Sequence, residues 1–448
     1  MDQSMLYHKQ TKKIVTLYRI ALSCFVAMAY LLHFFSYTFS GSVYSIVVLA
    51  LAILLLIVKP IYINHVPWFY SFWVLSLIVV LMNYLFQYRN NTVLFDFLIF
   101  LSCFLLCIAF SKKLDDYRKI LHLLVIFSCF FSAGVLLQRF IPSLYNTIMR
   151  IFPSRLASAI RSHGYNAESG SGVRGFTINT NFSAGYILAG LLVLVSRMLI
   201  NNKPRKKNII LLAFLILAVL YTRKRGHLLF MSIAIIMTYL IPARKTQKLK
   251  RIWNIFLVLL ILLLLFYIAR DALSQIPMFR IIILTFEKIE SGEDFTTGRF
   301  KLFQWAIELF RKNPLFGIGW GKYRTTVAGT VVRNKSLETH NVYLQLLSET
   351  GIIGFITFVG AFFSAWFLTK NHYCECIKET DPNLSEWRSA LFFSFAYQTF
   401  FMLYCLTGNP LFDQFYQIMY LFCCSIMIAY SYVKNHSEMV YPSLQEGS

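Results

Sequence analysis

Long apolar runs alternate with short polar segments from one end of the chain to the other. An α-helix needs about 20 mostly apolar residues to cross the hydrocarbon core of a bilayer. Runs of that length are expected at 14–37, 41–59, 66–88, 92–111, 119–141, 176–200, 208–222, 226–243, 252–270, 351–369, 389–406 and 411–433. The pattern therefore predicts an all-α polytopic membrane protein with about twelve transmembrane helices.

Composition excludes a water-soluble enzyme. Of the 448 residues, 57% are hydrophobic and only 14% are charged, against roughly 25% charged residues in soluble proteins. The net charge of +23 would indicate a nucleic-acid partner if the basic residues shared one face. Apolar spans divide them into short clusters instead, so membrane lipids are the expected partner and nucleic acid is not.

The nine cysteines do not predict a metal site or a disulfide framework. Their number is odd, most lie in apolar runs, and they lack metal-ligand spacing. Buried thiols are the simpler interpretation. We expect neither a metal nor a cofactor.

Lysine and arginine residues in the short loops set the orientation. Loops on the N-terminal side are rich in both residues, whereas the short loops at 38–40, 89–91 and 407–410 contain one basic residue, Arg89. We therefore expect the chain to lie in the plasma (inner) membrane, with both termini in the cytoplasm. The first run follows three lysines and is expected to be a retained signal anchor.

This orientation divides the chain into three parts. Residues 1–270 form helices one to nine, with an outer loop at 142–175. Residues 271–350 form a large, partly helical outer loop between spans nine and ten, expected to be catalytic. Residues 351–448 form helices ten to twelve and a cytoplasmic tail.

One outer turn breaks the charge rule. Arg223, Lys224 and Arg225 follow one another where outer turns ordinarily have no cations. They could snorkel into headgroups, or they could form an anion site, since charge at this depth is costly. The outer basic segments contain about twice as many basic as acidic residues, which favours an anionic substrate such as a lipid-linked pyrophosphate.

The large outer loop predicts an amphipathic helix. Its apolar positions at helical spacing are Phe300, Phe303, Ile307 and Phe310. Thr296 or Thr297 is the expected N-cap, and Asn313-Pro314 ends the helix. Arg299 lies in the first turn, where it is either solvated or shares an anion with the exposed backbone N–H groups.

A second helix is expected to begin at His340 and run to Gly351, where span ten opens. The positive end of a helix disfavours the cationic form of a histidine. His340 could therefore stay neutral and accept a proton, as a general base must. The alternative is a capping or surface histidine.

The joint pattern resembles the O-antigen ligase and Wzy-type polymerase family over roughly 170–360. The segments that carry the resemblance are Thr222 to Gly226, Thr297-Gly298-Arg299, Asn313 to Gly319, and His340-Asn341 with Gly351 following at the family's His-x10-Gly spacing. Members of this family use undecaprenyl-pyrophosphate-linked glycans as donors at the outer face of the plasma membrane. Polymerases join lipid-linked repeat units, and ligases pass the glycan to lipid A core sugars.

Carried over to this sequence, the resemblance implies catalytic roles for Arg225, Arg299 and His340. We also expect substrate binding by five further residues: Arg161, Arg174, Arg223, Lys224 and Asn341. Arg161 and Arg174 each precede a glycine by an Arg-x10-Gly spacing reported for some polymerases. The charge of Arg223 and Lys224 departs from the family pattern.

The implied chemistry needs no metal. Arginines could stabilise the departing pyrophosphate while His340 takes the acceptor proton, which gives inversion. An Asp-x-Asp pair is absent, which disfavours a nucleotide-sugar glycosyltransferase. The first outer loop, 37–41, has no acidic residue, which argues against lipid-sugar glycosyltransferases that keep a catalytic acid there.

We favour a polymerase, with an O-antigen ligase as the alternative. A lipid-linked oligosaccharide flippase is less favoured, because the two halves of the chain show no matching repeat. The expected partners are the lipid-linked donor, a lipid-linked or lipid A core acceptor, and a possible chain-length regulator protein.

Overall fold

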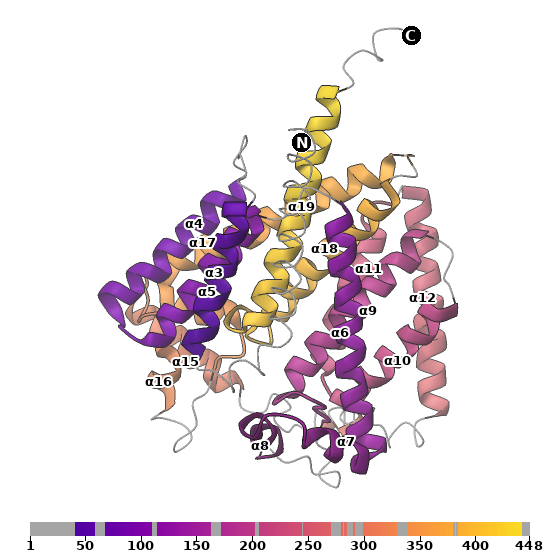
Figure 1. Cartoon of the computed structure of the whole chain (residues 1–448), viewed down its shortest axis with the longest axis horizontal. Coiled ribbons are helices and arrows are strands. Elements are labelled where there is room, and N and C mark those ends of the chain that lie inside the picture. The colour runs from indigo at the N-terminus through magenta and orange to yellow at the C-terminus, as the bar shows by residue number, and fades with distance from the viewer. Residues whose placement is uncertain are drawn as a thin grey trace, which may run out of the picture. The chain divides into compact units, whose positions relative to one another are not determined.

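The computed structural model describes residues 41–58, 68–109, 114–162, 172–201, 206–243, 245–269, 279–280, 282–284, 290–291, 299–328, 338–379, 381 and 384–440. Within these ranges every regular element is helical and none is a strand, as the apolar pattern predicts (Figure 1). The expected first span at 14–37 and the expected N-caps Thr296 and Thr297 lie outside the described residues.

The described helices follow the expected spans from the second one onward. They are α3 (Gly41–Val58), α4 (Trp68–Met82), the π-helix η1 (Asn83–Gln87), α5 (Asn91–Ala109), α6 (Leu114–Phe140), α7 (Pro142–Met149), α8 (Ser154–Ser162), α9 (Thr180–Asn201), α10 (Lys206–Thr222), α11 (Arg225–Leu240), α12 (Lys245–Ile268), α15 (Arg299–Lys312), α16 (Lys322–Ala328), α17 (Val342–Lys378), α18 (Ser385–Tyr404), the short η3 (Pro410–Phe412) and α19 (Gln414–Val440).

Five segments are long and apolar enough to cross a membrane. They are Trp68–Gln87, Leu114–Phe140, Thr180–Ile200, Val342–Lys378 and Gln414–Asn435. Exposed apolar side chains agree with a lipid surround: on α12, Trp253 is 59% exposed and Tyr267 is 79% exposed. Water would disfavour so extensive an apolar face. The chain has the helices of a membrane protein, and the count of twelve spans stays a prediction.

The chain divides into two compact units that each draw on distant parts of the sequence. One unit comprises Met1–Ile120, Lys301–His372 and Cys405–Ser448. The other comprises Leu121–Phe300 and Tyr373–Tyr404. We call them the first and the second unit.

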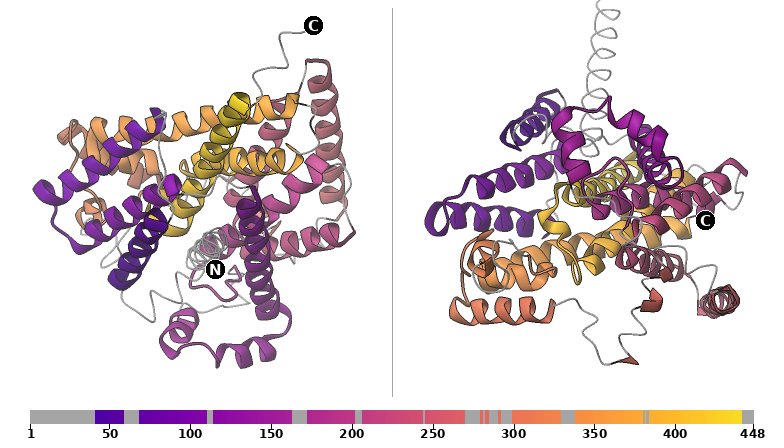
Figure 2. Two further views of the ribbon diagram at one scale, coloured as in Figure 1. Left: turned by 45° about the horizontal axis from the view of Figure 1, so that its top comes forward. Right: turned by 90° about the horizontal axis from the view of Figure 1, so that it is seen from below.

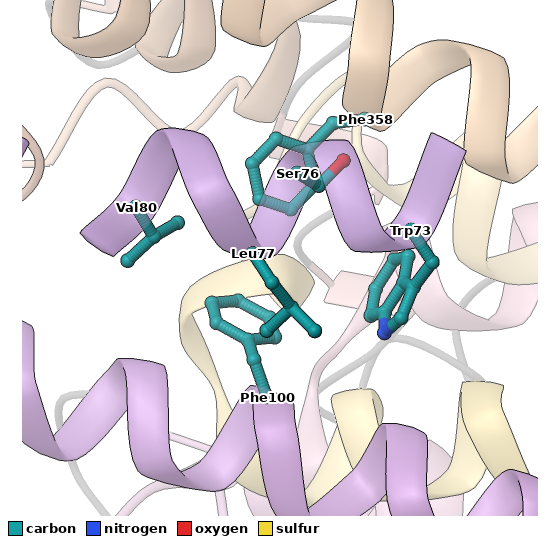
Figure 3. Close-up of a pocket in the computed structure, with 6 residues that line it drawn as sticks. All are labelled: Trp73, Ser76, Leu77, Val80, Phe100 and Phe358. Carbon is teal, nitrogen blue, oxygen red and sulfur yellow. The ribbon is translucent and has the colours of Figure 1, made fainter. Parts of the chain in front are cut away.

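The core of the first unit is built from aromatic rings. Trp73 of α4, Phe100 of α5 and Phe358 of α17 meet with ring centroids 5.9–6.1 Å apart. Figure 3 shows these rings around a small pocket between α4, α5 and α17, with Ser76 among the lining residues. The Ser76 hydroxyl donates to the carbonyl of Phe72 at 2.9 Å. This mostly apolar lining suits helix packing.

The second unit packs its helices around α9 and α18. α9 contacts α10 and α18, and α18 also contacts α11 (Figure 2). Ser128 of α6 allows a close approach to α9, because its Oγ donates to the carbonyl of Tyr186 and accepts from the N–H of Gly190. A Cβ at Gly190 would collide with Ser128.

Helix α15 ends before Asn313-Pro314 as predicted, but it buries a different face. Leu302 and Ala306 are buried, and they pack with Tyr323 and Val327. Two of the expected core residues are exposed instead, Phe300 at 61% and Ile307 at 39%. The helix has apolar residues on more than one side at the same spacing, so only its neighbours decide which side is buried.

Helix α17 differs from expectation only at its start. It begins at Val342, so His340 precedes the helix rather than opening it. It then continues through Gly351 to Lys378, with a local break at Gly351, where φ is 64° and ψ is −165°. Gly351 therefore separates two helical parts, so the helix that follows His340 runs to Gly351 as predicted.

Candidate active site

The loop at 172–177 holds Arg174 by its backbone. Gln138 of α6 accepts hydrogen bonds from the N–H groups of Arg174 and Gly175 at 3.1 and 2.7 Å. The hydroxyls of Thr177 and Ser183 donate to the Arg174 carbonyl. With its backbone tied at both ends by neutral side chains, Arg174 has little freedom except in its side chain. Its Nη1 is buried without a hydrogen-bond partner among the described residues.

The same loop packs against the turn between α10 and α11. The N–H of Val173 donates to the carbonyl of Tyr221 at 2.9 Å. A Cβ at Gly172 would collide with the carbonyl oxygen of Thr222. Arg223 adopts a left-handed backbone with φ of 67°, which costs a non-glycine residue roughly 1–2 kcal/mol. The loop and the turn thus bring Arg174 beside the three consecutive cations.

Lys224 lies at the centre of these cations. Its pKa is lowered from 10.5 to about 8, first by burial and then by the charges of Arg299, Arg174 and Arg223. In the described part of the chain, every charged group that acts on the pKa of Lys224 is another cation. Together, burial and repulsion make this a site where an anion would be strongly stabilised.

The neighbouring guanidiniums show the same repulsion. Burial lowers the pKa of Arg223, and the charges of Arg280 and Arg225 add to the effect. Burial likewise lowers the pKa of Arg299, where Arg225 acts in the same direction. We define the basic cluster as Arg174, Arg223, Lys224, Arg225, Arg280 and Arg299. All six belong to the second unit.

Arg161 lies at the edge of this region rather than within the basic cluster. It is exposed near the end of α8. Burial raises the pKa of Tyr145 to about 12, and the charges of Arg161 and Arg174 oppose that rise. Tyr145 in turn donates its hydroxyl to the carbonyl of Gly175 at 2.6 Å. Tyr145 therefore connects Arg161 with the loop that holds Arg174.

The sequence alone did not predict the roles of three residues in this region. Gln138 and Tyr145 hold the 172–177 loop, and Tyr404 of α18 raises the pKa of Arg299 by its charge interaction. The Tyr404 ring centroid lies 4.3 Å from that of His227. In the sequence, each of these residues lies in a segment that resembles an ordinary membrane span or loop. Only the fold shows that it lies beside the basic residues.

His340 lies in a different unit from the basic cluster. It has a left-handed backbone with φ of 54°, and it is partly exposed. We define the His340 loop as residues 338–341. It is tied to the segment after α18, because the N–H of Val342 donates to the carbonyl of Cys405 at 2.9 Å and Asn341 Nδ2 donates to the carbonyl of Leu406 at 3.2 Å.

Polar side chains brace the His340 loop on two sides. Glu338 forms an ion pair with Arg324 of α16 and also accepts a hydrogen bond from the Asn409 amide. The Thr339 hydroxyl donates to the carbonyl of Asn341 at 2.8 Å. The Glu338 charge is therefore compensated locally, which makes Glu338 a poorer candidate base than its neighbour His340.

The segment at 315–321 explains the spacing between His340 and Gly351. It lies against α17 at the kink, where Ile318 and Gly319 donate backbone N–H groups to the carbonyls of Ser348 and Glu349. A Cβ at Gly351 would collide with the backbone of Leu315, and one at Gly317 would collide with that of Glu349. The two glycines therefore interlock, which fixes the start of α17 and with it the His340 loop.

Glu349 has a structural position rather than a catalytic one. It is fully buried, and its Oε1 accepts hydrogen bonds from the N–H of Tyr323 at 3.1 Å and from Gln345 Nε2 at 3.3 Å. Its role is to hold the end of the 315–321 segment on α17. An acceptor hydroxyl could not reach it without opening that packing.

No group of three or more potential metal ligands occurs among the described residues. The acidic stretch 287–294 offers Glu290 within them, whereas Glu293 and Asp294 lie outside. The arrangement in the described part of the chain is one of cations, amides and a histidine. It can bind an anion and accept a proton.

Comparison with known families agrees with the resemblance seen in the sequence. Residues 209–359 match the family model described as O-antigen ligase. The match runs from α10 through the turn with its three cations to the kinked α17, and so includes Arg225, Arg299 and His340. No curated protein shows significant similarity to the chain.

Proposed function

We propose that this protein, whose residues 209–359 match the O-antigen ligase family model, polymerises oligosaccharide repeat units linked to undecaprenyl pyrophosphate. The family supports a membrane enzyme that transfers glycans. The proposal adds the donor, the acceptor and the direction of transfer. The reaction takes place at the outer face of the plasma membrane, with both termini of the chain in the cytoplasm.

The observation that carries the proposal is the basic cluster around Lys224. Among the described residues, only cations shift the pKa of Lys224 by their charge, and such a half-buried lysine is unfavourable until an anion enters. A lipid pyrophosphate is an anion of the right kind, and it gains negative charge as the glycosidic bond breaks. Arg225 and Arg299 would stabilise that charge as preorganised cations, with Arg174, Arg223 and Lys224 binding the phosphates.

His340 would act as the general base. It takes the proton of the acceptor hydroxyl as that oxygen attacks the anomeric carbon of the donor. The bond between that carbon and the pyrophosphate oxygen breaks, and the lipid pyrophosphate leaves with the electron pair. One direct displacement inverts the anomeric configuration and needs no metal. Asn341 would hold the acceptor beside His340.

A ligase is the second candidate, and the description of the matching family favours it. In a ligase the same donor chemistry would serve, but lipid A core sugars would replace the lipid-linked acceptor. A flippase would need neither a base nor a leaving-group site. A chain-length regulator protein would be a partner of the polymerase alone.

The test is a reconstituted assay with purified protein and lipid-linked repeat units. A ladder of products that differ by one repeat unit, formed without lipid A core, supports the polymerase. Transfer that requires added lipid A core and yields a single glycan per acceptor would favour the ligase instead. Unchanged glycan accompanied by movement of the lipid-linked donor across the bilayer would contradict both.

A further inference from the structure

Helices α7 and α8 form an elbow directly after a candidate membrane span. α6 ends at Phe140, and α7 begins at Pro142 (Figure 1). We define the elbow as residues 140–162. Because α6 is one of the five segments able to cross a membrane, the elbow starts where the apolar span stops, at the level of the lipid headgroups.

One side of the elbow has large apolar side chains that are exposed in the described part of the chain. Ile151 is 82% exposed, Ile141 is 47% exposed and Leu144 is 45% exposed. The other side is well packed, with Met149 and Leu156 fully buried. A packed element with exposed apolar tips is typical of a surface that meets a lipid or a partner.

The charges of the elbow indicate whether it contacts a lipid or a protein partner. Residues 140–162 contain three arginines, Arg150, Arg155 and Arg161, and no acidic residue. All three are exposed. Exposed apolar side chains next to arginines, without acidic residues, match a bilayer interface that contains anionic lipid. The apolar side chains can enter the acyl chains, and the headgroup phosphates attract the arginines.

The buried side of the elbow contacts the loop that carries Arg174. The rings of Tyr145 and Phe152 lie 5.7 and 5.3 Å from that of Phe176. The Tyr145 hydroxyl also donates to the carbonyl of Gly175 at 2.6 Å. Because of these contacts, the depth of the elbow in the bilayer also sets the depth of Arg174.

We propose that the elbow lies in the membrane interface, with Ile141, Leu144 and Ile151 among the acyl chains and its arginines at anionic headgroups, and that it thereby holds Arg174 at the depth of lipid phosphates. The second half of this inference rests on the proposed function. The first half does not, because it concerns only lipid contact.

Lipid contact can be measured on the full-length protein in vesicles of phosphatidylcholine and phosphatidylglycerol. A photoreactive benzoylphenylalanine replaces Ile151, and in a matched control it replaces Ser158, an exposed polar residue of α8. Illumination should give several times more lipid adducts at 151 than at 158. The same substitution at Leu144 provides a second position if the first variant folds poorly. Equal adduct yields, or crosslinks to a second protein chain, would overturn the proposal.

Headgroup preference is tested on the same protein. The double variant Arg155→Gln, Arg161→Gln should lower the share of phosphatidylglycerol among the adducts by up to about fivefold for each arginine removed. An unchanged share would refute the role of the arginines. These readouts need no turnover, so they stand whether or not the protein transfers glycans. If it does, Ile151→Asp should raise the KM for the donor more than it lowers kcat, as expected for a positioning residue.

Discussion

The basic cluster and the His340 loop handle charge in opposite ways. In the basic cluster, Lys224 is half-buried beside guanidiniums, and Arg174 is held through its backbone by neutral side chains. In the His340 loop, the carboxylate of Glu338 is matched by Arg324 and Asn409. A group of neighbouring cations suits an anionic ligand, whereas a locally paired carboxylate beside a histidine suits a neutral hydroxyl. The proposed function accordingly has the donor pyrophosphate in the first region and the acceptor in the second.

The largest expected effect tests the acceptor side. His340→Gln keeps a hydrogen-bonding group but cannot take up a proton, so kcat should fall by about 10²–10⁴-fold, which is what base catalysis contributes. The KM for the donor should change little, because in the proposed function the phosphates bind to the basic cluster and not to His340. Steady-state kinetics with lipid-linked repeat units measure both values. Near-normal turnover would show that His340 only orients the acceptor.

The next effect tests the donor side. Arg225→Lys keeps the charge but loses the planar pair of donors that fits a phosphate. We expect kcat/KM for the donor to fall on the order of 100-fold, as for loss of one preorganised charge-stabilising group. Arg311→Lys, on the last turn of α15 and outside the basic cluster, is the matched control and should stay active. If Arg225→Ala is well expressed and fully active, the turn serves only to anchor the chain at the lipid headgroups.

A third prediction concerns the frame that holds the His340 loop. Gly351→Ala places a Cβ in a conformation that is almost confined to glycine, which costs roughly 1–3 kcal/mol, and the new atom also collides with Leu315. Gly321→Ala shares a positive φ of 74° but meets open space beyond Val93. Thermal unfolding in detergent should therefore show a clearly larger loss of Tm for Gly351→Ala. Equal losses would mean that the interlock adds nothing.

Changes in pH should affect the basic cluster selectively. The pKa of Lys224 is lowered from 10.5 to about 8. Between these values the unfolded chain keeps a proton that the folded chain has released, so the free energy of unfolding should rise with pH. Donor affinity should fall severalfold over the same window, because a neutral amine does not attract pyrophosphate. Lys224→Met should flatten both trends, and a wild-type donor KM that is constant across pH 8 would contradict this role.

The smallest expected effect is that of chelators. If cations of the chain alone stabilise the leaving group, EDTA should leave the rate of glycan transfer unchanged. Added Mg²⁺ or Mn²⁺ should not raise it. Loss of activity that either ion restores would make Glu290, Glu293 or Asp294 a candidate metal site, and the division between a cationic donor region and a neutral acceptor region would need revision.

The sequence by itself was sufficient for the helical class, for most helix positions and for the choice of candidate residues. Apolar length predicts α9 and α19 because a bilayer demands it, and Asn313-Pro314 ends α15 because proline forbids continuation. Three cations in one outer turn stand out against the charge rule. These signals are local, so they can be recognised without knowing which segments pack together in the fold.

Tertiary structure decided which faces are buried and which side chains meet. The pattern of α15 offers two apolar stripes, and packing against Tyr323 and Val327 selects Leu302 over Phe300. The contacts of Gln138 and Tyr145 with the 172–177 loop join residues 30 to 37 positions apart. The kink at Gly351 depends on Leu315. Such contacts form between segments distant in sequence, so no local pattern of residue types can specify them.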